Sequence, residues 1–195
     1  QDAPRYGAER RGAPIFAYVR ASRQLINERG IIGQPDLVVV AYDSLVSLPA
    51  ACVLQGLRQQ TDMLINIHDA PEVWKDRLNT APTVLILTAM EDSEDRADLP
   101  FVGTACAAAA ACLVGVISRD LVLEAIRVEL AAHGSQLVER NSNTALRAYD
   151  AMAAQAGCVT EGVEISASNY DKPQWIDLPC EDVDRAAPSV HAAAT

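Results

Sequence analysis

Asp36-Leu37-Val38-Val39-Val40-Ala41-Tyr42 is the segment that says most about the fold of this chain. Its apolar residues follow one another without alternation, which is typical of a parallel strand covered by helices on both faces. Two similar runs follow, Met63-Leu64-Ile65-Asn66-Ile67 and Thr83-Val84-Leu85-Ile86-Leu87. All three runs are short and rich in β-branched residues, and polar segments separate them. We therefore expect a series of parallel strands.

The remaining segments predict an earlier strand and several helices. The strand is expected at residues 15–21, and the helices at residues 49–60, 71–77, 103–115, 118–134 and 136–155. Pro49 stands in the first turn of its helix, where the missing N–H costs nothing. Ser118 is a candidate N-cap, with Asp120 favourably placed in the first turn. The expected fold class is α/β, a Rossmann-like, open, mostly parallel sheet flanked by helices and followed by an extended C-terminal tail.

The chain is expected to form one α/β domain and a tail. Its 195 residues suffice to bury a sizeable core. We place the domain at residues 1–156 and an extended tail or linker at residues 157–195, where prolines and isolated aromatic residues replace the helical pattern.

Composition and charge narrow the range of partners. The chain has 26 acidic and 16 basic residues and a net charge of -10. This balance disfavours binding to a phosphate backbone, so we expect no nucleic-acid partner. The longest apolar window, residues 101–117, consists mostly of alanine and is a poor membrane span. We expect a cytoplasmic protein with no membrane association.

Metal and cluster sites are not expected in this chain. The five cysteines, at positions 52, 106, 112, 158 and 180, form no C-x-x-C pair, which disfavours zinc and iron–sulfur sites. Buried free thiols are the simpler interpretation. The acidic run at residues 91–95 lacks the alternating ligands and the glycine of a calcium loop, so a solvated turn is expected.

The first candidate binding segment is a charged loop between two glycines. It reads Tyr6-Gly7-Ala8-Glu9-Arg10-Arg11-Gly12-Ala13-Pro14. The glycines allow close approach of the backbone to a ligand or to another chain. Arg10, Arg11 and the later Arg20 are the first residues to consider for binding phosphates or carboxylates. An intersubunit ion pair with a carboxylate is an alternative use of these arginines.

A second group of candidates follows the carboxyl ends of the predicted strands, where open α/β sheets usually bind ligands. Asp43 and Ser44 follow the first of these strands, and Asn66, His68 and Asp69 end or follow the next. His68 and Asp69 have the composition of an acid–base pair. Adjacent residues on an extended segment point to opposite faces, so we expect His68 to be a polar loop residue.

The charged loop resembles the Tyr-Gly-x-Glu-x-Arg-Gly-Gly loop in the gamma subunit or domain of the 2-oxoacid:ferredoxin oxidoreductases. The match departs at Ala13, where the family usually has a second glycine. Further similarity in the family's order lies at residues 35–40, 64–66, 115–118 and 138–141, with Ala145 and Tyr149 beyond. The resemblance covers about residues 4–152. The family's N-terminal Gly-x-Gly-Gly-Gln-Gly turn is not in this sequence, and residues 187–191 resemble a linker to a ferredoxin-like domain. Both features suggest a fragment of a longer polypeptide.

The resemblance implies a role in a multi-subunit enzyme. Such oxidoreductases convert a 2-oxoacid and coenzyme A to acyl-CoA and carbon dioxide, with thiamine diphosphate, Mg²⁺ and [4Fe-4S] clusters. The chain is expected to bind none of these cofactors itself. It is expected to scaffold alpha-, beta- and delta-type subunits that pass electrons to ferredoxin or another acceptor. Its loop, Tyr6, Gly7, Glu9, Arg10, Arg11 and Gly12, is expected to help enclose coenzyme A or to form an interface, with Asp43 and Asn66 as further candidates.

Two other functions stay open at this point. The first is a free-standing Rossmann-like module that binds a nucleotide, against which the missing Gly-x-Gly-x-x-Gly turn counts. The second is a structural adaptor of some other complex. The substrate also stays open among pyruvate, 2-oxoglutarate and aromatic 2-oxoacids such as phenylglyoxylate or indolepyruvate.

Overall fold

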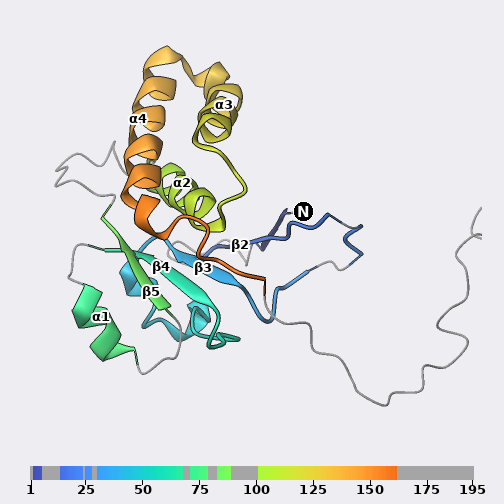
Figure 1. Ribbon diagram of the computed structural model, residues 1–195, viewed down its shortest axis with the longest axis vertical. Helices are drawn as coiled ribbons and strands as arrows, with labels where there is room; N and C mark the ends of the chain where they lie inside the picture. The colour runs from blue at the N-terminus through green and yellow to red at the C-terminus, as the bar shows by residue number, and fades with distance from the viewer. Residues whose placement is uncertain are drawn as a thin grey trace, which may run out of the picture. The chain divides into compact units, whose positions relative to one another are not determined.

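A computed structural model describes residues 2–5, 14–23, 25–27, 30–67, 71–78, 83–88 and 101–161, of which residues 2–5 are described by their backbone alone. Figure 1 shows the elements in chain order. The strands are β1 (Asp2–Arg5), β2 (Phe16–Val19), β3 (Leu37–Val40), β4 (Asp62–Asn66) and β5 (Thr83–Leu87). The α-helices are α1 (Pro71–Arg77), α2 (Phe101–Val114), α3 (Arg119–Leu130) and α4 (Ser135–Ala151). Short 3-10 helices are η1 (Asp43–Leu45), η2 (Pro49–Ala51), η4 (Ala131–His133) and η5 (Ala153–Gln155).

The centre of the described domain is a parallel sheet with the strand order β3-β4-β5. In its register Val39 lies opposite Leu64, and Leu64 lies opposite Leu85. Every residue of β4 is buried, as expected for a strand between two neighbours with both faces covered. β3 lies at one edge of this sheet, and Val39 is 39% exposed. The predicted α/β class is confirmed, but the strand that is buried on both faces is β4, whereas the wholly apolar β3 is partly exposed.

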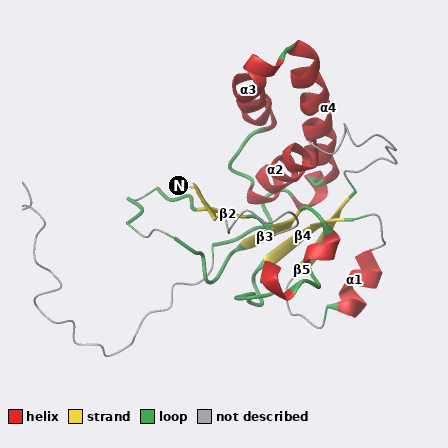
Figure 2. Ribbon diagram, turned by 180° about the vertical axis from the view of Figure 1, so that it is seen from behind, coloured by secondary structure: helices red, strands yellow, loops and turns green. Residues whose placement is uncertain are grey.

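Two hydrophobic clusters cover the two faces of this sheet. Because side chains alternate along a strand, Leu64 and Leu87 point to one face, where they pack with residues of α2 and α4. Met63 and Ile65 point to the other face, where Trp74 of α1 joins them. Figures 1 and 2 show the same arrangement, with α2 and α4 on one side of the sheet and α1 on the other.

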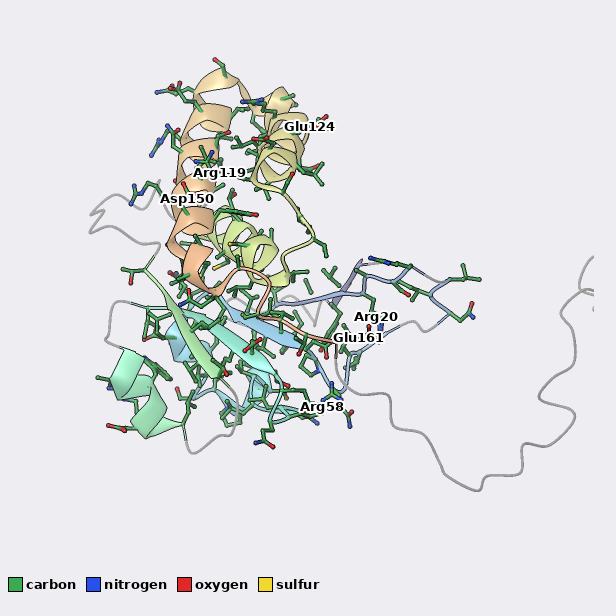
Figure 3. All side chains as sticks on the ribbon, in the orientation of Figure 1. Arg20, Arg58, Arg119, Glu124, Asp150 and Glu161 are labelled. Carbon is green, nitrogen blue, oxygen red and sulfur yellow. The ribbon has the colours of Figure 1, made fainter. Side chains whose placement is uncertain are left out.

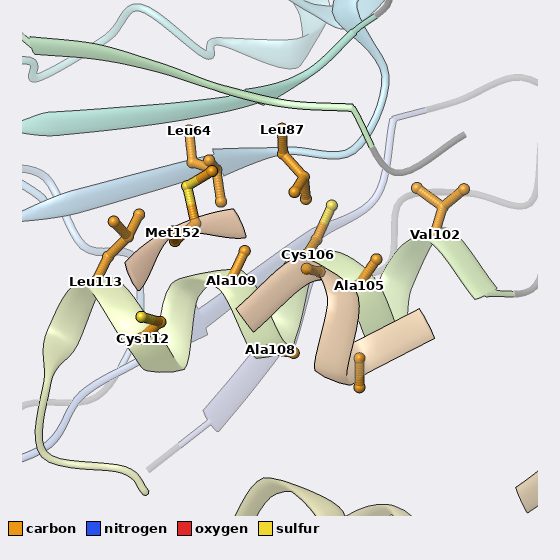
Figure 4. Packing of buried hydrophobic residues seen from close by; sticks show 12 residues of the cluster. Leu64, Leu87, Val102, Ala105, Cys106, Ala108, Ala109, Cys112, Leu113 and Met152 are labelled. Atoms are coloured by element: carbon orange, nitrogen blue, oxygen red, sulfur yellow. The ribbon is translucent and has the colours of Figure 1, made fainter. Parts of the chain in front are cut away.

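Alanines let α2 pack closely on its neighbours. Ala105, Ala108 and Ala109 have no exposed surface, and Leu113 fills the end of the same cluster. Figure 4 shows Ala105 and Ala109 on the side of α2 that faces Leu64 and Leu87 of the sheet, and Ala108 on the other side of the helix. The predicted helix at residues 103–115 is therefore confirmed, beginning two residues earlier at Phe101.

The strand predicted at residues 15–21 does not belong to the parallel sheet. β2 pairs antiparallel with β1, from Asp2 opposite Val19 to Arg5 opposite Phe16, in a sheet of two strands. The apolar residues of this segment indicate an extended conformation, but they do not indicate whether the neighbouring strand runs parallel or antiparallel. The prediction of a strand was right, and its place as the first strand of the parallel series was wrong.

The helix predicted at residues 49–60 is also wrong. Pro49 does occupy the first turn, but the 3-10 helix η2 ends after Ala51. Cys52 then adopts a left-handed conformation with φ 46°, and Gly56 follows with φ 77°. Residues in this region of φ cannot continue a right-handed helix, so the chain turns toward β4 instead.

Helices α3 and α4 confirm the last two predicted helices. Ser118 is the N-cap of α3, and its hydroxyl accepts a hydrogen bond from the Leu121 N–H at 3.3 Å. The guanidinium of Arg119 donates to both carboxylate oxygens of Asp150 on α4, each at 2.9 Å. The Tyr149 hydroxyl donates to the Ile117 carbonyl at 3.1 Å. These bonds fix the start of α3 against the end of α4 (Figure 3).

The segment after α4 caps the end of α2. The Gly157 N–H donates to the Cys112 carbonyl at 3.0 Å, and the Val159 N–H donates to the Leu113 carbonyl at 3.1 Å. Carbonyls in the last turn of a helix have no partner within the helix, so these bonds satisfy two of them. The tail predicted at residues 157–195 lies outside the described residues from Gly162 onward, so its extended form stays a prediction.

Candidate functional site

The carboxyl edge of the parallel sheet brings two of the predicted site residues close together in the fold. Asn66 ends β4, is 4% exposed, and donates from Nδ2 to the Ala41 carbonyl at 3.0 Å. Asp43 opens η1 two residues after Ala41, and its carbonyl accepts the Val46 N–H at 2.9 Å. Buried amides are usually satisfied by hydrogen bonds, and this one links the ends of β3 and β4. Asn66 therefore has a structural role at the edge where a ligand was expected.

Arg20 binds backbone of its own chain. Its guanidinium donates to the Gly30 carbonyl at 2.9 Å and to the Ile31 carbonyl at 3.1 Å. The planar fork of arginine suits two neighbouring acceptors, and here it ties the end of β2 to the segment that leads to β3. Figure 3 shows Arg20 between these two parts of the chain. The described contacts give Arg20 a positioning role.

The charged loop of the sequence lies between the paired strands β1 and β2. Arg5 of β1 and Phe16 of β2 form the last pair of the antiparallel register, so the residues between them connect the two strands. Tyr6, Gly7, Glu9, Arg10, Arg11 and Gly12 lie outside the described residues, as do His68 and Asp69. Its ligand or partner stays a prediction.

A polar cluster that sequence reasoning missed lies at the opposite, amino edge of the sheet. Arg58 donates to a carboxylate oxygen of Asp36 at 3.2 Å and to the side chain of Gln34 at 3.2 Å. Thr61 accepts the Arg58 N–H at 3.0 Å and donates from its hydroxyl to the Pro35 carbonyl at 2.8 Å. These bonds fix the start of β3 beside the start of β4. A Pro-Asp pair before one strand and an Arg before the next was the available signal.

Asp62 is a buried carboxylate at the same amino edge. It is the first residue of β4 and 8% exposed. Burial raises the pKa of Asp62, and hydrogen bonds with the side chains of Cys158 and Thr83 lower it in part. Strands β4 and β5 and the segment after α4 thus meet at one acidic side chain. This cluster lies at the opposite end of the strands from the edge where open sheets usually bind ligands.

The described cysteines do not fit a metal or cluster site. Cys106 and Cys112 are buried in α2, whereas Cys52 and Cys158 are exposed. The expectation of buried thiols is therefore right for two residues and wrong for two. Burial raises the pKa of Cys106 to about 11, which disfavours the thiolate that a metal requires. Within the described ranges, no three His, Cys, Asp or Glu side chains gather as metal ligands.

No helix in the described part of the chain combines the length and the hydrophobicity that a bilayer crossing demands. α2 is the most apolar of these helices, and it has only 14 residues. Its alanines are used in packing on the sheet and α4.

Comparison with known proteins decides the family of this fold. Residues 1–151 match the family described as pyruvate ferredoxin/flavodoxin oxidoreductase. The chain belongs to this family. The resemblance seen in the charged loop and in the strand motifs is thereby confirmed, and it covers both sheets and nearly all of the helical region.

Gamma-type subunits of the pyruvate ferredoxin/flavodoxin oxidoreductase family are among the relatives. The "pyruvate/ketoisovalerate oxidoreductases common subunit gamma" of Pyrococcus furiosus is 32% identical over 151 residues, covering 77% of this chain and 79% of that protein. The "pyruvate synthase subunit PorC" of Methanocaldococcus jannaschii is 32% identical over 157 residues, covering 80% of this chain and 82% of that protein.

A solved member of the pyruvate oxidoreductases has the same fold. It is the crystal structure of pyruvate oxidoreductase subunit PORC from Thermotoga maritima, which superposes with a TM-score of 0.55 at 21% identity. The superposition covers 77% of this chain and 78% of that chain. At this identity the likeness supports the fold alone, while the relatives of higher identity carry the family relation.

Proposed function

We propose that this chain is the gamma-type subunit of a multi-subunit enzyme that oxidatively decarboxylates a 2-oxoacid with coenzyme A, yielding acyl-CoA and carbon dioxide. The observation that carries the proposal is the family match over residues 1–151, together with gamma-type relatives of which this chain covers about four-fifths. The chain's part is that of a scaffold. Its described polar clusters fix strands and helices to one another.

The cofactors of the reaction belong, in this proposal, to other subunits. The enzyme uses thiamine diphosphate with Mg²⁺ for decarboxylation and [4Fe-4S] clusters for electron transfer. The described thiols of this chain do not fit a cluster, because two are buried in α2 and the other two lie on separate segments. No catalytic step is therefore assigned to residues of this chain.

Alpha-, beta- and delta-type subunits are the proposed partners, with ferredoxin or another carrier as the electron acceptor and the cytoplasm as the location. Support comes from the names of the relatives, which describe subunits of larger enzymes. Pyruvate is the substrate to test first, followed by branched 2-oxoacids such as ketoisovalerate. These names give no support to an aromatic 2-oxoacid such as phenylglyoxylate.

Within this function, the connection between β1 and β2 is proposed to help enclose coenzyme A. Arg10 and Arg11 supply positive charge on a segment held at both ends by the hairpin. Arginine side chains bind phosphate groups through paired N–H donors. The double variant Arg10→Glu/Arg11→Glu is therefore expected to raise the KM for coenzyme A about tenfold or more in the assembled enzyme. The KM for the 2-oxoacid should stay unchanged.

A matched control separates this effect from a change in net charge. Arg140→Glu/Arg147→Glu alters charge equally at two exposed positions of α4, and it should leave both Michaelis constants unchanged. If both double variants retain the wild-type KM for coenzyme A, the loop does not bind coenzyme A. If the first variant fails to assemble while remaining folded, the loop is an intersubunit contact instead.

A further inference from the structure

Helix α3 has apolar side chains that do not pack against the rest of the described domain. Its residues Val122 and Ile126 pack against the cluster formed by α2, α4 and the sheet, yet no residue of α3 is fully buried. Leu121 is 51% exposed and Val128 is 74% exposed. Single exposed apolar residues are ordinary on a protein surface, whereas a row of them at helical spacing indicates a contact surface.

The exposed apolar residues of α3 form one row. Leu121, Ala125 and Val128 are spaced four and three residues apart and are all exposed, so they share one side of the helix. At about 100° per residue, this row spans about 60°, and its centre is about 110° around the helix from the centre of Val122 and Ile126. We call Leu121, Ala125 and Val128 the α3 stripe. An amphipathic helix has one apolar side, and α3 has a second one that faces solvent.

Carboxylates border the α3 stripe on both sides. Glu124 lies next to Val128 around the helix, and Glu129 lies next to Ala125 on the other border. Both glutamates are exposed. Figure 3 labels Glu124 on the part of α3 that faces away from the sheet. The stripe is therefore an apolar row between two negative borders.

We infer that the α3 stripe docks a helix of another subunit, one whose own apolar row is bordered by lysine or arginine. The inference rests on the proposed function, which supplies the other subunits. Apolar residues at i, i+4 and i+7 match the spacing by which one helix packs along another. The acidic borders select the charge of the partner, because like charges facing each other across an interface cost binding energy. A second copy of this chain would place glutamates against glutamates and is disfavoured.

The first test changes the stripe in the full chain and measures the dissociation constant of that chain with the remaining subunits of its enzyme. Leu121→Glu/Val128→Glu should weaken binding about 100-fold or more, because buried contacts at the centre of an interface dominate affinity. The control is Leu48→Glu/Leu54→Glu, at residues that are 38% and 42% exposed and lie outside α3. The control should change binding by less than about threefold. Circular dichroism checks that each variant remains folded.

The second test addresses the charge of the partner. Glu124→Lys/Glu129→Lys should weaken binding about tenfold at low salt, and the difference should shrink as salt is added. A photo-cross-linking amino acid in place of Ala125 should then attach to a helical peptide of another subunit that contains lysine or arginine. Tighter binding of the lysine variant, or a cross-link to an acidic segment or to a second copy, would overturn the inference.

The two proposals fail in different ways. If the unmodified chain binds the other subunits and the stripe variant binds them equally well, the docking inference is wrong and the proposed function stands. If the unmodified chain binds none of them, the proposed function is wrong and the docking inference falls with it.

Discussion

The contact between Gly115 and Gly157 gives the sharpest prediction about stability. Both residues have positive φ, 75° for Gly115 and 71° for Gly157. A Cβ added to Gly115 would lie 2.7 Å from the Gly157 Cα, whereas a Cβ added to Gly157 would lie 3.9 Å from the Gly115 Cα. The first distance forces the two backbones apart, and the second is an ordinary van der Waals contact. Two substitutions with the same backbone strain therefore differ in their steric effect.

Gly115→Ala should lower the free energy of unfolding by about 3 kcal/mol. About 1 kcal/mol comes from placing alanine in the left-handed region. About 1 kcal/mol more comes from each of two hydrogen bonds, from the Gly157 and Val159 N–H groups to carbonyls of α2. Gly157→Ala should lower the free energy of unfolding only by about 1 kcal/mol, the cost of placing alanine in the left-handed region. Urea unfolding of the full chain, followed by circular dichroism, measures both values.

Gly103→Ala provides a control of opposite sign. Gly103 lies within α2, and a Cβ there meets nothing within 4 Å. Alanine should therefore stabilise the helix by about 0.5 to 1 kcal/mol. Hydrogen exchange adds a local readout, since the amides of Gly157 and Val159 should exchange faster in Gly115→Ala. Equal losses in Gly115→Ala and Gly157→Ala, with unchanged exchange, would refute the reasoning.

Two further predictions concern titratable groups. Burial raises the pKa of Asp62 in the folded protein. Its contribution to stability is therefore full below the pKa that Asp62 has in the unfolded chain, and it is lost as the pH rises through the pKa in the folded protein. The free energy of unfolding, measured from pH 3 to 7, should therefore fall for the wild type relative to Asp62→Asn as the pH rises. A difference between the two proteins that does not change with pH would contradict burial as the cause. The buried Cys106 thiol, with its pKa raised to about 11, should resist iodoacetamide at pH 8 in the native protein. The exposed Cys52 should react at that pH. Peptide mass mapping measures both modifications, and faster modification of Cys106 than of Cys52 would contradict the prediction.

The sequence predicted the parts of the fold that follow from local pattern. Apolar runs placed β4 and β5, and Pro71 marked the start of α1. The capping hydroxyl of Ser118 marked the start of α3. In each case the signal lies in residues that are neighbours in the sequence.

The errors arose where distant contacts or rare conformations decide the structure. Cys52 is the one residue other than glycine with positive φ in the described part of the chain, and the predicted helix from Pro49 ends there. Nothing in a cysteine signals this conformation. The direction in which β2 pairs depends on β1 and on the connection between them. Whether a strand lies at the edge or in the centre of a sheet likewise depends on the order of the strands. The amino-acid pattern of β3 alone does not indicate that order.

The described contacts of two candidate site residues, Asn66 and Arg20, are with backbone of their own chain. Asn66 lies at the carboxyl edge of the sheet as expected, but its amide is used to join β3 and β4. Arg20 has paired acceptors as expected of an arginine fork, but they are backbone carbonyls. The cluster around Arg58 joins residues more than twenty positions apart, so the Pro-Asp pair and the arginine indicate it only when the two distant segments are considered together.

This chain is a subunit of a 2-oxoacid oxidoreductase by its family and its relatives. The most direct measurement is to purify the assembly through a tag on this chain and to assay reduction of a dye with pyruvate and coenzyme A. The account predicts co-purifying subunits, bound thiamine diphosphate and iron–sulfur clusters, and dye reduction that requires both substrates. A chain that purifies without partners and binds a nucleotide by itself would contradict the claim.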